Sequence, residues 1–88
     1  MRTIWKYELT PSSYFTMPAG AMILDVQVQY DKPCMWALVD TDQATYQQQR
    51  HFVIYGTGHV ITHDDMVYIG TFQLDHGSLV FHVFEVFE

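Results

Sequence analysis

The stretch "AMILDVQVQYDKPCMWALVD", residues 21–40, decides the fold class. Apolar and polar side chains alternate through its first half. The apolar set is Leu24, Val26, Val28 and Tyr30, and the polar set is Asp25, Gln27 and Gln29. Because the side chains of a β-strand point alternately to opposite faces, this period of two predicts a strand with one dry and one solvated face. The turn signal "DKP" and the apolar run Cys34–Asp40 then predict a hairpin whose second arm lies in the middle of a sheet.

Further strands are predicted on both sides of this hairpin, separated by turn signals such as "PAG" and "DHG". They span residues 3–9, 14–17, 50–56, 66–74 and 78–87. The polar run 41–49 predicts an exposed, mobile hairpin loop, and residues 58–65 predict a turn with a short extended segment. No helical period is visible. The pattern predicts one all-β domain over residues 1–88, a small β-sandwich or barrel of six to seven mostly antiparallel strands.

The composition restricts the partners. Ten acidic against four basic residues give a formal net charge of −6, whereas a conventional nucleic-acid binder needs a basic stripe to replace phosphate counterions. We therefore expect no binding of duplex DNA or RNA. Charged residues make up 16% of the chain, against about 25% in ordinary globular domains, and hydrophobic residues make up 49%. A chain this short buries only about 60% of its unfolded surface, so the apolar excess predicts a homo-oligomer.

The last predicted strand, residues 78–87, supports the same expectation. It carries bulky side chains on both faces, and an exposed edge of such a strand would recruit another chain. We expect it either in the middle of a sheet or paired across a subunit interface.

Cysteine content and hydropathy set two further limits. Cys34 is the single cysteine, which excludes an intramolecular disulfide, and its apolar surroundings predict a small buried hydrophobe. No apolar segment approaches the roughly 20 residues that a membrane helix needs, and the first residues lack the apolar run of a signal peptide. We therefore expect no membrane partner and a cytoplasmic location.

The loop "YGTGHVITHDD", residues 55–65, is the most unusual part of the sequence. Its two glycines can form a concave nest of backbone N–H groups, to which the Thr57 hydroxyl and the His59 ring would add donors for a phosphate. The alternative interpretation is a tight turn or bulge between strands. A metal site is not predicted, because His59 and His63 would lie about 13 Å apart in an extended chain.

No catalytic residues are predicted. The serines, threonines and Cys34 lie in no nucleophile-elbow or catalytic-cysteine context, and His82 lies in the most apolar strand, where a hydrogen-bonded core histidine is expected. We therefore expect a protein that is not an enzyme and that uses no cofactor.

The succession "IWKYEL", "MPAGAMILDVQVQ", "CMWALVD", "YGTGHVI", "YIGTFQL" and "LVFHVFE" resembles a family of small proteins of unknown function encoded by bacteriophages. The resemblance runs from Ile4 to Glu88, with a variable loop at residues 41–49. The recurring positions correspond here to Met17, Pro18 and Gly20, to Trp36–Val39, to Gly56–His59 and to Leu79–His82. The family implies a viral source and no catalytic assignment.

A viral source favours a protein that acts stoichiometrically on a host defence in the host cytoplasm. We expect it to bind and sequester a small nucleotide-like signal, with phosphate held by the backbone and donors of the glycine loop and the base stacked on an aromatic ring. The expected ligand-binding residues are Gly56, Thr57, Gly58, His59, Tyr55, Trp5, Trp36 and Gln27. Two alternatives remain open, a protein-interaction module that inhibits a host defence protein directly and a structural or accessory virion component.

Overall fold

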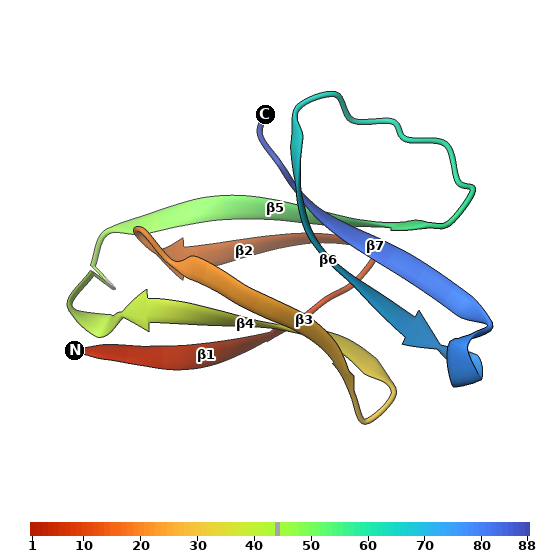
Figure 1. Ribbon diagram of the computed structural model, residues 1–88. Coiled ribbons are helices and arrows are strands. Elements are labelled where there is room, and N and C mark those ends of the chain that lie inside the picture. Colours follow the sequence, from red (N-terminus) through yellow and green to blue (C-terminus); the bar gives the residue numbers. More distant parts are fainter. Residues whose placement is uncertain (44) are drawn as a thin grey trace.

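The computed structural model describes residues 1–43 and 45–88 and confirms an all-β fold (Figure 1). Its strands are β1 (Arg2–Glu8), β2 (Ser12–Pro18), β3 (Met22–Gln29), β4 (Lys32–Asp40), β5 (Gln47–Gly56), β6 (Met66–Leu74) and β7 (Leu79–Val86). Two single 3₁₀ turns, η1 (Thr41–Gln43) and η2 (Asp75–Gly77), join β4 to β5 and β6 to β7. Among the described residues there is no α-helix, and hence no helix long and apolar enough to cross a membrane.

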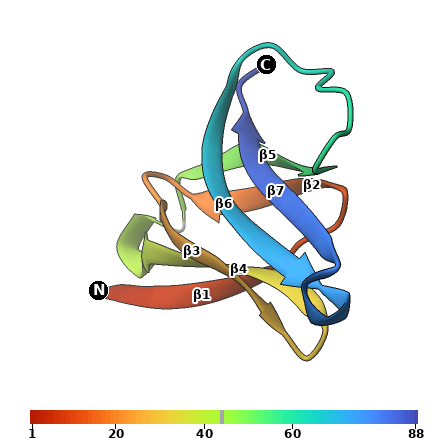
Figure 2. The same ribbon diagram turned by 45° about the vertical axis from the view of Figure 1, so that its right-hand side comes forward.

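The strands form two antiparallel sheets, packed as the two layers of a sandwich (Figure 2). One sheet has three strands in the order β1-β4-β3, and the other has four in the order β2-β5-β7-β6. The two sheets also meet where β3 contacts β6. At this contact an added Cβ at Gly70 would lie 3.3 Å from the Val26 Cβ, so the close approach of the two strands leaves little room for a side chain there.

The predicted positions of two strands are confirmed. β4 lies in the middle of its sheet, as the apolar run Cys34–Asp40 predicted. β7 lies between β5 and β6, which is the first of the two positions expected for it. Both edges of β7 are therefore paired within the chain, and its apolar character gives no reason for a subunit interface.

The sequence-based prediction of which side chains of β3 face the core is wrong at both ends of the strand. A register shift between Ile23 and Asp25 marks a β-bulge, so Ile23 packs against the core and Leu24 is exposed. Such a bulge adds one residue to one strand and shifts its alternation. Tyr30 is exposed because it forms, with Asp31, a two-residue hairpin turn in which both residues have positive φ values of 52° and 63°. The side chain leaves the sheet at this turn.

The predicted loop 41–49 is also wrong in part. β5 begins at Gln47, and its residues Gln47–Gln49 pair with Thr16–Pro18 of β2. β2 is longer than the predicted 14–17, and it therefore offers partners to a polar segment that has no apolar pattern of its own. Ala44 lies outside the described residues. The segment 59–65, where a turn with a short extended segment was expected, belongs to no strand.

The core lies between the two sheets. The largest fully buried side chains are Phe52, Met17, Met35, Val26, Val39, Val83 and Pro18. Register explains this set, because Met35 of β4 lies opposite both Tyr7 of β1 and Val26 of β3, and Phe52 of β5 lies opposite Ser13 of β2. Inward-facing side chains of neighbouring strands therefore stack in rows across each sheet.

One ion pair is buried at the edge of this core. Arg50 of β5 donates two hydrogen bonds to the carboxylate of Glu85 of β7, at 2.7 and 2.8 Å, and a third to the backbone carbonyl of Ala21. The side chains of Arg50 and Glu85 are only 18% and 8% exposed. Hydrogen bonding to Glu85 raises the pKa of Arg50 above its already high ordinary value. The pair joins two strands of one sheet to the turn that leads into the other.

Replacing Arg50 by alanine should lower the free energy of unfolding by about 3–5 kcal/mol, because Glu85 would be left buried without its partner. Lys32→Ala is the matched control, because the Lys32–Glu8 pair lies at 3.5 Å with side chains 63% and 56% exposed. That change should cost less than about 1 kcal/mol. Urea denaturation of both variants measures the difference, and equal losses would contradict a structural role for the buried pair.

Tyr7→Phe should raise the free energy of unfolding by about 1 kcal/mol, since a buried hydroxyl without a partner costs its desolvation. The Tyr7 ring packs on Phe15 at 5.0 Å between centroids, and among the described residues its hydroxyl is the one buried side-chain polar atom without a hydrogen bond. Burial raises the pKa of Tyr7, with an opposing effect of Arg50. A loss of stability in urea denaturation would mean that the hydroxyl has a partner in solution.

Candidate functional site

A group of polar side chains surrounds His51 on the outer face of the four-stranded sheet. Alternation along β5 explains its position, because Phe52 and Ile54 pack against the core, and the odd-numbered residues beside them, His51 included, face the other way. Register places Tyr14 of β2 directly beside His51. The ring of His51 is nevertheless buried, because neighbouring side chains cover it.

A chain of hydrogen bonds runs through the His51 ring. Nδ1 lies 2.5 Å from Oε1 of Glu88, and Nε2 lies 2.8 Å from the hydroxyl of Ser12. Because a carboxylate accepts only, a neutral ring carries its proton on Nδ1 and accepts at Nε2 from the Ser12 hydroxyl. The Tyr14 ring stacks on His51 at 4.0 Å, and its hydroxyl donates to the same Glu88 oxygen at 3.2 Å. Desolvation, together with this carboxylate, raises the pKa of Tyr14.

The second histidine of the group comes from the excursion, the segment 57–65 that joins β5 to β6. The hydroxyl of Tyr55 holds it, lying 2.7 Å from His63 Nδ1 and accepting from the backbone N–H of Thr62 at 3.2 Å. The pKa of Tyr55 is lowered, chiefly by its hydrogen bond with the Thr62 hydroxyl. The His63 ring stands edge-on to His51, with centroids 5.6 Å apart.

The excursion and the chain end close over this face together. In Figures 1 and 2 the excursion arches beside the C-terminus, and the backbone N–H of Phe87 donates to the carbonyl of Asp65 at 2.9 Å. His51, His63 and Glu88 meet here, and each offers one ligating atom within 4.8 Å of the others. We call these three residues the His–His–Glu cluster.

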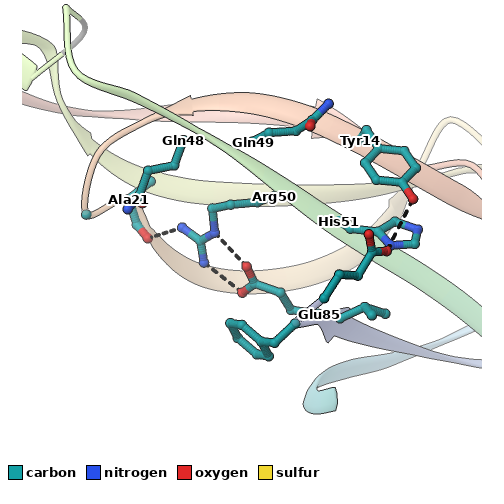
Figure 3. A pocket seen from close by; sticks show the side chains of 11 residues that line it. Tyr14, Ala21, Gln48, Gln49, Arg50, His51 and Glu85 are labelled. Atoms are coloured by element: carbon teal, nitrogen blue, oxygen red, sulfur yellow. Dashed lines mark hydrogen bonds and ion pairs between the residues drawn. The ribbon is translucent and has the colours of Figure 1, made fainter. Parts of the chain in front are cut away.

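A hollow of about 760 Å³ lies next to the cluster (Figure 3). Tyr14 and Phe87 contribute aromatic rings, and Gln48 and Gln49 contribute side-chain amides. Figure 3 shows the Arg50–Glu85 pair on one side of the hollow and His51 with Tyr14 on another. The hollow therefore combines apolar faces, hydrogen-bonding amides and charged groups within the reach of one small molecule.

The glycine loop that the sequence analysis singled out lies at the other end of β5. Its donors are engaged within the chain: the N–H of Gly56 donates to the His59 ring at 3.2 Å, that of Thr57 to Val80 at 3.1 Å, and that of His59 to Gly56 at 3.0 Å. The His59 ring lies on Gly56, where an added Cβ would come within 2.7 Å of it. A ligand at Gly56–His59 would have to displace these contacts, with the exception of the Gly58 N–H.

The structure separates the other predicted ligand residues. Tyr55 adjoins the glycine loop, but Trp5, Trp36 and Gln27 belong to β1, β4 and β3 of the other sheet. His82 is hydrogen-bonded as expected, at 2.7 Å to the Thr57 hydroxyl and at 3.1 Å to that of Thr71. It lies half-buried on the outer face, however, and not in the core.

The residues that do converge were missed by the sequence analysis. They are Ser12, Tyr14, Arg50, His51, His63, Glu85 and Glu88. No spacing motif connects them, since His51 lies 12 residues before His63 and 37 before Glu88. One local signal was present, because the alternation of β5 places His51 out of phase with Phe52 and Ile54.

Fold and site together define a small antiparallel β-sandwich protein with a polar histidine cluster beside a surface hollow. The chain belongs to the family described as domain of unknown function DUF7352, whose model matches residues 1–88. Comparisons with curated proteins and with solved structures gave no match.

The hydroxyl of Tyr55 should decide how firmly the excursion is held. Tyr55→Phe should speed amide hydrogen exchange in residues 57–65 several-fold while leaving the strands unchanged, because the hydrogen bonds to Thr62 and His63 are lost. Tyr68→Phe is the matched control, since it removes a 2.6 Å hydrogen bond to Thr71 outside the excursion. Equal exchange in both variants would show that other contacts hold the segment.

Proposed function

We propose that this protein is a non-catalytic binding protein that holds a small nucleotide-like ligand in the hollow beside His51. The observation that carries the proposal is the combination of groups in that hollow. Its volume of about 760 Å³ lies within the roughly 300–1,000 Å³ of small-molecule sites. Exposed aromatic rings offer stacking faces for a base, and side-chain amides offer donors and acceptors for its edges.

The charges around the hollow favour recognition of the base of the ligand rather than of its phosphates. The guanidinium of Arg50 is already neutralised by Glu85, and Glu88 adds a further carboxylate at the rim. We infer that a base stacks on Tyr14, with Gln48 or Gln49 at its edge, while phosphates remain at the open side. This arrangement replaces the glycine loop as the proposed contact region, because most donors of Gly56–His59 are engaged within the chain.

The resemblance to bacteriophage proteins supplies the biological role in this proposal. A stoichiometric binder acting in the host cytoplasm would counter a host defence by removing a nucleotide signal from solution. The membership in a family of unknown function is compatible with this role and adds no chemistry to it.

A second candidate function is direct inhibition of a host defence protein, and one observation favours it. On the outer face of the three-stranded sheet, Ile4, Leu38 and Met22 lie opposite one another in register, and Ile4 and Met22 are exposed. Leu24 is exposed next to them at the bulge. A row of exposed apolar side chains across a sheet is suited to a protein partner or to a second copy of the chain.

Calorimetric titration with cyclic dinucleotides and ADP-ribose derivatives tests the first candidate. At least one ligand should bind, and Tyr14→Ala should weaken binding by about tenfold through the loss of stacking. Tyr68→Ala is the matched control, because the two tyrosines are 55% and 56% exposed on the same sheet and only Tyr14 lines the hollow. A panel without any binder, together with purified protein that releases no nucleotide on denaturation, would contradict the proposal.

A further inference from the structure

We propose that the His–His–Glu cluster is a binding site for one divalent transition-metal ion, with Zn²⁺ as the ion that fits best. His51 comes from β5, His63 from the excursion and Glu88 from the residues after β7. Three separate parts of the chain thus bring two imidazoles and one carboxylate to a single point, with their ligating atoms within 4.8 Å of one another. The inference is independent of what fills the hollow.

The distances suit a metal ion after a small adjustment. Zn²⁺ binds imidazole nitrogen and carboxylate oxygen at about 2.0–2.2 Å, which places the atoms of a tetrahedral set about 3.3 Å apart. The His51 and Glu88 atoms, 2.5 Å apart, have to separate, and the wider pairs, up to 4.8 Å apart, have to close, each by about 1 Å. Such a movement is available, because the side chain of Glu88 is 55% exposed and the His63 ring lies on a segment outside the strands.

In each imidazole, one ring nitrogen is already hydrogen-bonded to a side-chain hydroxyl. Ser12 lies at His51 Nε2 and Tyr55 lies at His63 Nδ1, at 2.8 and 2.7 Å. A histidine that binds metal donates the N–H of its second ring nitrogen to an acceptor, which holds the direction of the ring. A hydroxyl can be that acceptor, so an ion at His51 Nδ1 would replace the proton there, and Nε2 would then donate to the Ser12 hydroxyl. With both hydroxyls kept, the ion would be bound by His51 Nδ1, which faces Glu88, and by His63 Nε2.

The donor set selects the class of metal. Two nitrogens and one carboxylate suit Zn²⁺ and its neighbours, whereas Ca²⁺ and Mg²⁺ prefer sites built of oxygen. Three protein ligands also leave a fourth position for water or another ligand, as in catalytic zinc sites. Two of the three ligands, His51 and Glu88, line the hollow.

The same residues permit one other chemistry. Ser12, His51 and Glu88 are connected in the order of a serine–histidine–acid triad, with the hydroxyl at Nε2 and the carboxylate at Nδ1. That interpretation gives no role to His63, which stands edge-on to His51 with a ligating atom directed into the cluster. A metal ion uses all three members of the cluster, and we therefore favour it.

Isothermal titration of the untagged, chelator-treated full chain with zinc chloride tests the proposal. We expect one ion per chain with micromolar or tighter affinity, a raised melting temperature in zinc, and the visible absorption of a tetrahedral site when Co²⁺ replaces Zn²⁺. His63→Gln should weaken zinc binding at least tenfold, and Glu88→Gln should do the same. Both positions lie outside the strands, so neither change should unfold the sheets.

His82→Gln is the matched control. His82 lies on the same face between two threonine hydroxyls, and none of the acidic residues that the structure describes hydrogen-bonds to it. Its replacement should leave zinc affinity unchanged. The proposal is overturned if wild-type protein binds no zinc at micromolar concentrations, or if His82→Gln weakens binding as much as His63→Gln. Labelling of Ser12 by a fluorophosphonate in protein that does not bind zinc would assign the cluster to nucleophilic chemistry and overturn it as well.

Discussion

The buried ion pair between Arg50 and Glu85 is the constraint on which the rest of the molecule depends. A charge removed from water is tolerated only when its partner is in place, so these two residues fix β5 against β7 in one register. The third hydrogen bond of Arg50, to the Ala21 carbonyl, holds the turn before β3 at the edge of the other sheet. The guanidinium of Arg50 therefore holds both the register of β5 against β7 and the turn at the edge of the other sheet.

The position of the histidine cluster follows from this pair. Because Arg50 faces the interior, its neighbour His51 faces outward, and because Glu85 is held, the residues after it are directed to the same edge. Glu88 reaches His51 from that direction. The same pair also lines the hollow, so the group that stabilises the fold shapes one side of the proposed binding site.

Two faces of the protein offer different kinds of contact. The outer face of the four-stranded sheet carries the histidine cluster and Tyr14 beside a hollow that also reaches the Arg50–Glu85 pair, whereas the outer face of the three-stranded sheet carries an exposed row with Ile4 and Met22. The polar groups of the first face form directional bonds and can select a small ligand or ion. The apolar row of the second face suits a protein surface, because binding would bury its apolar area. The two faces belong to different sheets, so one chain has room for a ligand and a partner at once.

The sequence by itself determined the class of fold and its local hairpins. Alternation along residues 24–29 and the run Cys34–Asp40 predicted β3 and β4 with their turn, and the positive φ of His76 and Gly77 agrees with the turn expected at residues 75–77. These features are local, because side-chain period and turn conformation depend on residues that are neighbours in the chain.

Only the tertiary structure decided where the chemistry lies. The bulge beside Leu24 reversed a predicted face, and pairing with β2 made a strand of the polar residues Gln47–Gln49. The glycine loop attracted attention because its donors are adjacent in sequence, but the chain uses most of them itself. His51 and Glu88 become neighbours only through the order β2-β5-β7-β6, and no local pattern encodes strand order, because pairing depends on contacts between segments far apart in the sequence.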